Sequence, residues 1–167
     1  RASVPPDCAI QFTDLLQGPQ HTALGKSLAD FVVRRKDGLD AYQLAVVVDD
    51  ATQGITHVVR GSDLLDSTPR QIFLQQQLTY PTPRYAHLPV ITTGQGQKFS
   101  KQNHAPALNN ERAADNLRCA LRFLHQADPP PTLTSAEQLL SYAIEHWVLQ
   151  RVPATMAIPA ASFGLGA

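Results

Sequence analysis

Two apolar segments lie close together in the middle of the chain, and each is followed by charged side chains. Residues 41–48 are nearly all apolar and lead into Asp49 and Asp50, while residues 54–59 lead into the group at 60–63. Such runs are typical of strands buried on both faces of a parallel sheet, although the first run also fits the start of a buried helix. The sequence therefore predicts an α/β fold in which the residues after each strand face a ligand crevice.

A further strand and a helix are expected on either side of this pair. Residues 30–35 are expected to form a short strand. Thr68 and Gln71 have capping-box spacing with Pro69 at the first helical position, which predicts a helix of about ten residues. Residues 79–83 contain two prolines and cannot continue this helix. The side chains expected to point inward are those of Ile72, Phe73 and Leu78.

Two amphipathic helices are expected in the last third of the chain. They cover residues 111–126 and 135–150, joined by the proline-rich linker at 128–131. Thr134 and Glu137 have the spacing of a capping box at the start of the second helix. Its expected apolar face consists of Leu140, Ile144, Trp147 and Val148.

A loop with two lysines precedes these helices. Lys98 and Lys101 flank Ser100, and the loop before them contains Gly94 and Gly96. Lysines on a glycine-hinged loop can bring positive charge to a polyphosphate, although a surface loop can carry such a solvated pair by chance. A dinucleotide fingerprint is not supported, because a third glycine and a following helix are lacking.

Five ordered motifs resemble one enzyme family. They are residues 41–50, 54–63, 67–71, 87–89 and 98–108. In order and spacing they are similar to the second half of the catalytic domain of glutamyl-tRNA synthetases, which are class I aminoacyl-tRNA synthetases. Within that family the best match is the shortened paralogue, glutamyl-Q tRNA(Asp) synthetase. The resemblance extends from about Phe12 to Leu124.

This resemblance implies a fold and an activity. Residues 1–80 would be the carboxyl-terminal half of a Rossmann-like catalytic domain, and residues 81–167 would hold the lysine signature loop and a small helical stem-contact region. The implied activity is activation of glutamate with ATP and Mg²⁺ without prior tRNA binding. Glutamate would then be transferred to queuosine at the wobble position of tRNA(Asp).

The resemblance also assigns two glutamate contacts. Tyr42 and Arg60 match family residues that touch the amino acid, and a guanidinium suits a two-pronged grip on a carboxylate. Without the resemblance, Tyr42 would be a core aromatic residue. Arg60, at the end of a buried strand, would equally be paired with an acidic neighbour. The candidates for that ion pair are Asp49, Asp50 and Asp63.

ATP is expected to contact the signature loop. Adenylate formation needs no general base, because the attacking carboxylate is already ionised, so the enzyme must stabilise charge on the phosphates. Lys101 matches the second lysine of the signature and is the candidate catalytic residue. Lys98 and Ser100 are expected to give supporting contacts.

Several departures leave two alternatives open. Val46 stands where discriminating glutamyl enzymes usually have asparagine, and about 65 residues follow the loop, too few for a full anticodon-binding region. The chain begins with Arg1, so we expect a fragment whose missing amino-terminal half holds the HIGH-type ATP motif and any zinc module. The alternatives are a truncated ordinary glutamyl-tRNA synthetase and a synthetase-derived interaction module without catalysis.

Composition sets weaker limits. Fourteen basic and fourteen acidic residues cancel, so an RNA contact would need a local patch. An apolar run long enough for a membrane span is not found, and a cytoplasmic location is expected. Cys8 and Cys119 have no nearby cysteine partner, so a zinc site is not expected here and both thiols should be free and buried.

Overall fold

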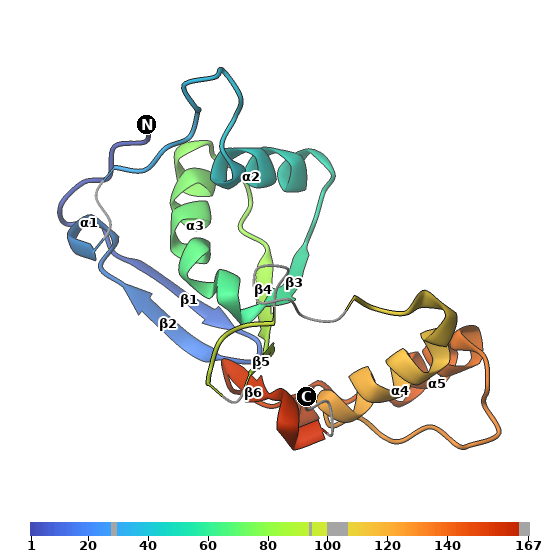
Figure 1. The fold of residues 1–167 in the computed structure, drawn as a ribbon. Helices are drawn as coiled ribbons and strands as arrows, with labels where there is room; N and C mark the ends of the chain where they lie inside the picture. Colours follow the sequence, from blue (N-terminus) through green and yellow to red (C-terminus); the bar gives the residue numbers. More distant parts are fainter. Residues whose placement is uncertain (28–29, 94, 100–106, 164–167) are drawn as a thin grey trace. The chain divides into compact units, whose positions relative to one another are not determined.

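The computed structural model describes residues 1–27, 30–93, 95–99 and 107–163. The chain forms two compact units, Arg1–His87 and Leu88–Ala167, and each is described by itself. Within the described residues there are three two-stranded sheets (Figure 1). The fold is therefore α/β with small sheets, and the strands do not join into one continuous parallel sheet.

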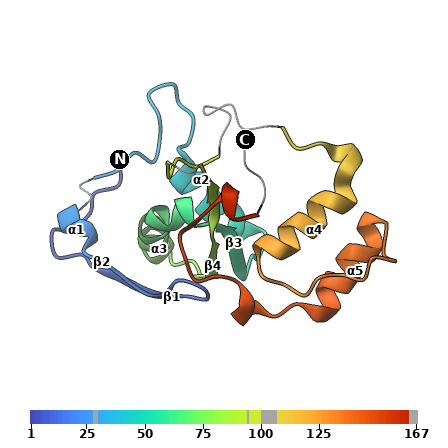
Figure 2. The ribbon, with the colours of Figure 1, turned by 60° about the horizontal axis from the view of Figure 1, so that its bottom comes forward.

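The first unit is built around helix α3. Its elements are β1 (Ile10–Asp14), β2 (Gly18–Thr22), α1 (Leu24–Ser27), α2 (Tyr42–Thr52), β3 (His57–Gly61), a 3-10 turn (Ser62–Ser67), α3 (Thr68–Gln77) and β4 (Arg84–Leu88). Figures 1 and 2 show α3 between the β1–β2 hairpin and the β3–β4 pair. The expected strand near residues 54–59 is confirmed as β3, shifted toward the carboxyl end of the segment.

The β1–β2 hairpin carries the first residue of the candidate site. The strands pair antiparallel from Ile10 opposite Thr22 to Asp14 opposite Gly18. Gly18 has a φ of 73°, which suits a residue without Cβ. The Asp14 carboxylate closes the turn by accepting hydrogen bonds from the backbone N–H groups of Leu16 and Gln17, at 3.0 and 2.9 Å. The turn thus holds the Asp14 side chain in place.

Helix α2 occupies the segment where a buried strand was expected, so that prediction is wrong and the helical alternative is correct. Val47 is buried, while Tyr42 and Asp49 are exposed. A helix satisfies its own backbone hydrogen bonds, so it can lie at the surface of the unit with one side covered, whereas a strand needs partners beside it. The strand expected at residues 30–35 is also absent, and two isolated bridges lie there instead.

Helix α3 confirms the expected ten-residue helix and corrects its start. Pro69 lies in its first turn, but the N-cap position falls on Ser67, whose side chain makes no capping hydrogen bond. Ile72 and Phe73 are buried as expected, with relative exposures of 3% and 4%, whereas Leu78 is 40% exposed because it lies past the last turn. Their burial joins α3 to the hydrophobic core of this unit. That core consists of Val4, Ile10, Leu24, Ile72, Phe73 and Tyr85.

The second unit contains two short strands and two helices that lie side by side (Figure 2). Its elements are β5 (Val90–Thr92), a 3-10 turn (Asn110–Arg112), α4 (Ala113–Phe123), α5 (Ala136–His146), a 3-10 turn (Leu149–Arg151), β6 (Ala157–Pro159) and a 3-10 turn (Ala160–Phe163). Strands β5 and β6 pair in parallel. Arg118 of α4 donates hydrogen bonds of 2.7 to 2.8 Å to the carbonyls of Pro129, Pro130 and Leu133, which fixes the proline-rich linker.

Helix α5 differs from the expectation in its cap and its buried face. The capping box is formed by Ser135 and Gln138, one residue after the expected pair. Leu139 is fully buried. The expected apolar face is therefore wrong as a buried face, because Leu139 is the buried residue of the helix and α5 ends at His146, before Trp147 and Val148. Its members are largely exposed: Leu140 at 49%, Ile144 at 79% and Trp147 at 40%, with Val148 partly buried.

The structure also bears on the cysteines, on membrane-spanning helices and on metal ligands. Both cysteines are free as expected, but Cys8 is partly buried and Cys119, on the outer side of α4, is exposed. None of the described helices is long and apolar enough to cross a membrane. In the described part of the chain there is also no group of three or more metal-ligating side chains.

Candidate active site

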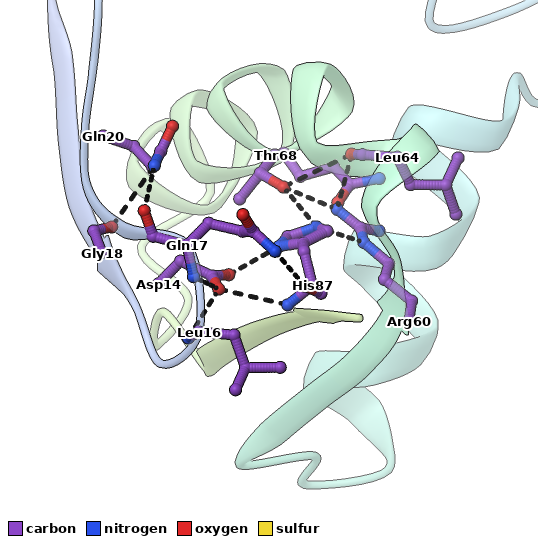
Figure 3. Close-up of polar contacts among 10 residues, drawn as sticks. Asp14, Leu16, Gln17, Gly18, Gln20, Arg60, Leu64, Thr68 and His87 are labelled. Atoms are coloured by element: carbon purple, nitrogen blue, oxygen red, sulfur yellow. Dashed lines mark hydrogen bonds and ion pairs between the residues drawn. The ribbon is translucent and has the colours of Figure 1, made fainter. Parts of the chain in front are cut away.

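Arg60 is the fourth residue of β3, and its side chain lies among polar groups (Figure 3). Its Nε donates a hydrogen bond of 3.1 Å to His87 Nε2. Its Nη2 donates bonds of 2.8 Å to Thr68 Oγ1 and to Gln71 Oε1, with a longer contact to the carbonyl of Leu64 at 3.4 Å. Among the described residues, Nη1 has no hydrogen-bond partner. The guanidinium is therefore fixed by its Nε and Nη2 groups.

The ion pair that sequence reasoning allowed for Arg60 is not found among the described residues. Its hydrogen bonds there go to uncharged groups, and Asp49, Asp50 and Asp63 are not among its partners. Asp50 lies near enough for Arg60 to lower its pKa, but burial has the larger, opposite effect and raises the pKa of Asp50 above 3.8. The positive charge of Arg60 thus has no acidic partner in the described structure.

The two residues expected to cap α3 are instead partners of Arg60. Gln71 accepts from Arg60 through Oε1 and donates through Nε2 to Gln43 Oε1, at 2.9 Å. Gln43 Nε2 then donates to Ser67 Oγ, at 3.2 Å. This chain of hydrogen bonds joins α2 to α3 and sets the direction of each amide. It also places Tyr42, the neighbour of Gln43, on the helix that is tied to Arg60.

A buried carboxylate and imidazole lie behind Arg60. Asp14 Oδ2 is 2.6 Å from His87 Nδ1, and both side chains have no exposed surface. Asp14 Oδ1 accepts from the backbone N–H groups of Leu16, Gln17 and His87, the last at 3.2 Å. Burial raises the pKa of Asp14, but these hydrogen bonds together outweigh it and hold the pKa below 3.8. Asp14 is therefore ionised at neutral pH.

His87 is uncharged at neutral pH. Burial lowers its pKa below 6.5, with Arg60 acting in the same direction, although the hydrogen bond and the charge of Asp14 oppose them. The geometry supports this direction, because a protonated Nε2 would face the Nε–H of Arg60, a second donor, at 3.1 Å. His87 thus offers a lone pair to Arg60.

Tyr85 of β4 lies beneath the guanidinium. The Cζ atom of Arg60 is 5.5 Å from the centre of the Tyr85 ring, a cation–π distance. The Tyr85 hydroxyl accepts from Gln75 Nε2 at 2.9 Å. Burial raises the pKa of Tyr85 above 10.0, so the ring stays neutral. Tyr85 therefore supports Arg60 without neutralising its charge.

The structure describes only some of the site residues that the sequence predicted. Tyr42 is the first residue of α2 and is 51% exposed, so it is not a core residue. Lys98 is exposed and forms an isolated bridge with Thr92 in the second unit. Ser100 and Lys101 lie outside the described residues. The structure thus places Tyr42 on α2, the helix whose Gln43 is linked to Arg60 through Gln71, and it leaves the lysine loop untested.

Sequence reasoning missed the inner part of this site. Asp14 was given no role, His87 was noted only as part of a motif, and Thr68 and Gln71 were taken as a helix cap. Asp14 and His87 are 73 residues apart, and no local pattern links positions so distant. A usable signal was the turn after Asp14, Leu-Leu-Gln-Gly, since an aspartate before a tight turn often holds backbone N–H groups.

Comparisons with known proteins place this fold in a family. Residues 1–126 match the family described as tRNA synthetases class I (E and Q), catalytic domain. The chain therefore belongs to this class I tRNA synthetase family, a family of ligases. It is 52% identical over 154 residues to a glutamyl-Q tRNA(Asp) synthetase of Neisseria meningitidis serogroup C, covering 92% of this chain and 52% of that protein. It is 47% identical over 158 residues to the protein of the same name from Pseudomonas fluorescens, with 93% and 53% covered.

Solved structures agree on the fold. A glutamate tRNA ligase from Elizabethkingia meningosepticum, crystallised in complex with its amino acid, superposes with a TM-score of 0.67 at 22% identity, over 90% of this chain and 34% of that one. The glutamate-tRNA synthetase of Elizabethkingia anophelis gives the same score at 23% identity, over 94% and 36%. The chain spans about half the length of the curated relatives it matches.

Proposed function

We propose that this chain is part of an enzyme that activates glutamate with MgATP and transfers it to queuosine at the wobble position of tRNA(Asp). The observation that carries the proposal is the guanidinium of Arg60. It is partly buried and rigidly held, and in the described residues it lacks an acidic partner. A charge in that setting is costly unless an anion binds to it. A substrate carboxylate supplies that anion.

Tyr42 and Arg60 would hold the amino acid. Arg60 Nη1 is available to a carboxylate, and Tyr42 presents a half-exposed ring on the helix tied to Arg60 through Gln43 and Gln71. A neutral Tyr85 and a neutral His87 leave the positive charge of Arg60 undiminished. These features favour binding of a carboxylate, and the names of the relatives give glutamate as the amino acid.

The chemical step would be adenylate formation. A carboxylate oxygen of glutamate attacks the α-phosphorus of ATP, the bond from that phosphorus to the bridging oxygen breaks, and pyrophosphate leaves with its electrons. Lys101 would stabilise the charge that develops on the phosphates, with Lys98 and Ser100 giving further contacts. Mg²⁺ would enter bound to ATP, as part of the substrate. The acyl group would then pass to queuosine, and AMP would leave.

We assign the parts of the chain accordingly. Residues 1–80 would form the carboxyl-terminal half of the catalytic domain, and residues 81–167 the signature loop and a helical region that contacts the tRNA stem. The basis is the share of the relatives that the chain spans, together with the order of its motifs. The HIGH-type ATP motif, and any zinc module, would belong to the other half.

Glutamate-dependent exchange of pyrophosphate into ATP tests this function. The full reading frame that encodes these residues should catalyse exchange with glutamate and without tRNA. Lys101→Ala should slow exchange by about 100-fold or more, the range for loss of one charge-stabilising group. Lys36→Ala, in the exposed 36–38 turn, is the matched control and should exchange at the wild-type rate. Exchange that requires tRNA would favour an ordinary glutamyl-tRNA synthetase, and no exchange would favour a non-catalytic module.

A further inference from the structure

The buried pair of Asp14 and His87 has no part in the chemistry proposed above. Removing a carboxylate and an imidazole from water is costly, and here both are fully buried. The pair also joins the β1–β2 hairpin to β4, together with the bond from Gln17 Nε2 to the carbonyl of His87 at 2.8 Å. A link between two elements would not require groups that titrate. The position of Asp14 and His87 next to Arg60 suggests why a carboxylate and an imidazole are used there.

The hydrogen bonds of Asp14 determine which nitrogen of His87 carries hydrogen. An ionised carboxylate can only accept hydrogen bonds, so the nitrogen 2.6 Å from Asp14 Oδ2, which is Nδ1, must donate. In the neutral ring Nε2 then carries a lone pair. That lone pair lies 3.1 Å from Arg60 Nε and 3.1 Å from Thr68 Oγ1, and both of these groups can donate to it.

We propose that Asp14 and His87 are positioning residues for Arg60: Asp14 holds His87 in its Nδ1–H form, and His87 Nε2 in turn fixes the guanidinium through Nε. With Nε and Nη2 committed to the protein, Nη1 is directed to the substrate carboxylate. In the opposite tautomer, Nε2–H would face Nε–H and displace the guanidinium. This inference rests on the proposed role of Arg60 in binding glutamate.

The alternative is that the pair contributes to folding alone. In that case, changes at either residue would lower stability and would not alter the glutamate requirement of the folded protein. A positioning role makes a different prediction, because it depends on which nitrogen of residue 87 is retained. Asparagine can reproduce the Nδ1 donor toward Asp14 but not the acceptor toward Arg60. Glutamine can reproduce the Nε2 acceptor but not the donor.

Three variants of the full reading frame separate these roles. Asp14→Asn presents an amide donor to Nδ1 and should reverse the tautomer, and His87→Asn removes the acceptor. Each should raise the KM for glutamate by about 10- to 100-fold, the range for a hydrogen bond to a charged group, with the KM for ATP within about threefold of wild type. His87→Gln should raise the glutamate KM clearly less than His87→Asn. Asp7→Asn, at an exposed aspartate, is the control.

Nitrogen NMR of the imidazole of His87 is the second measurement, and it does not depend on activity. The wild-type protein should show hydrogen on Nδ1, and folded Asp14→Asn should show hydrogen on Nε2. An Nε2–H form in the wild type overturns the inference even if no variant folds. Equal glutamate KM values for His87→Asn and His87→Gln overturn it while leaving the proposed function intact. If the wild type shows the Nδ1–H form but does not exchange pyrophosphate, the proposed function fails and this inference fails with it.

Discussion

At the scale of single residues, the main feature of the site is that the Arg60 guanidinium is held by uncharged groups and has no acidic partner among the described residues. The hydrogen bonds of Arg60 in the described structure go to uncharged groups, and the nearest buried carboxylate, Asp14, is separated from it by His87. In this arrangement Asp14 accepts its side-chain hydrogen bond from the neutral His87 and not from Arg60, so the charge of Arg60 stays available. A direct ion pair, which the sequence equally allowed, would have consumed that charge.

Replacing Arg60 by lysine should therefore affect glutamate more than ATP. Lysine keeps the charge but loses the planar set of donors that reaches His87, Thr68 and Gln71 together. We expect the glutamate KM to rise at least tenfold and the ATP KM to change by less than about threefold. Steady-state exchange kinetics with each substrate varied measure both values. A larger effect on ATP would place Arg60 in the nucleotide site.

His87 should make the stability of the protein depend on pH near neutrality. Its pKa is below 6.5 in the folded state because of burial and Arg60. Between the folded pKa and 6.5 the unfolded chain binds a proton that the folded protein does not. Its contribution is therefore complete above 6.5 and is lost as pH falls through that range. Asp14, whose folded pKa is below 3.8, contributes pH dependence only at more acid values.

Denaturant unfolding of wild type and His87→Gln from about pH 7.5 to about pH 5 measures this contribution. The free energy of unfolding of the wild type should fall more steeply, by at most about 1.4 kcal/mol for each pH unit of added slope. His57→Gln, at an exposed histidine, is the control and should keep the wild-type slope. Parallel curves for wild type and His87→Gln would mean that the pKa of His87 is the same in the folded and the unfolded state.

At the scale of elements, local signals succeeded where one segment determines its own structure. The ten-residue helix α3, the break at the prolines after it, and the two carboxyl-terminal helices were all predictable from spacing and turn residues. The strand expected at residues 41–48 failed because three consecutive valines favour strands locally. In the fold, packing against α3 and the bond from Gln71 to Gln43 favour a helix there.

The candidate site was predictable only in part, for the same reason. The resemblance pointed to Tyr42 and Arg60, and the structure ties Arg60 through Gln71 and Gln43 to α2, the helix on which Tyr42 lies. Thr68 and Gln71 were noticed, but their spacing fitted a local cap, and the competing partner, Arg60, is 8 and 11 residues away. Asp14 and His87 are brought together only by the packing of the hairpin against β4, which no local pattern encodes.

The start of α5 gives a direct test of a corrected element. Ser135 accepts from the Gln138 N–H at 3.2 Å, and Gln138 Oε1 accepts from the backbone of Ser135, also at 3.2 Å. Ser135→Ala should lower the free energy of unfolding by about 1 kcal/mol. Thr134→Ala, the position first expected to cap the helix, should change it by less than about 0.5 kcal/mol. Denaturant titration of both variants measures the two free energies of unfolding. A larger loss for Thr134→Ala than for Ser135→Ala would mean that Thr134 caps the helix, as the sequence predicted.

At the scale of the whole molecule, the chain spans about half of its curated relatives. In the proposed enzyme, ATP is held both by the signature loop and by a motif in the other half, and such joint positioning can supply about 7 to 11 kcal/mol of a barrier. We therefore expect residues 1–167 alone to give no glutamate-dependent exchange. The full reading frame, assayed in parallel, is the positive control. Adenylate formation by the 167-residue chain would show that the other half is dispensable.

The acceptor of glutamate is the most distinctive part of the proposed function. Transfer of labelled glutamate from the full reading frame should be measured with tRNA(Asp) that carries queuosine and with the same tRNA lacking it. We expect labelling of the queuosine-containing tRNA(Asp) alone, at the anticodon and not at the 3′ end. Labelling of the 3′ end of tRNA(Glu), or equal labelling of tRNA(Asp) with and without queuosine, would contradict it.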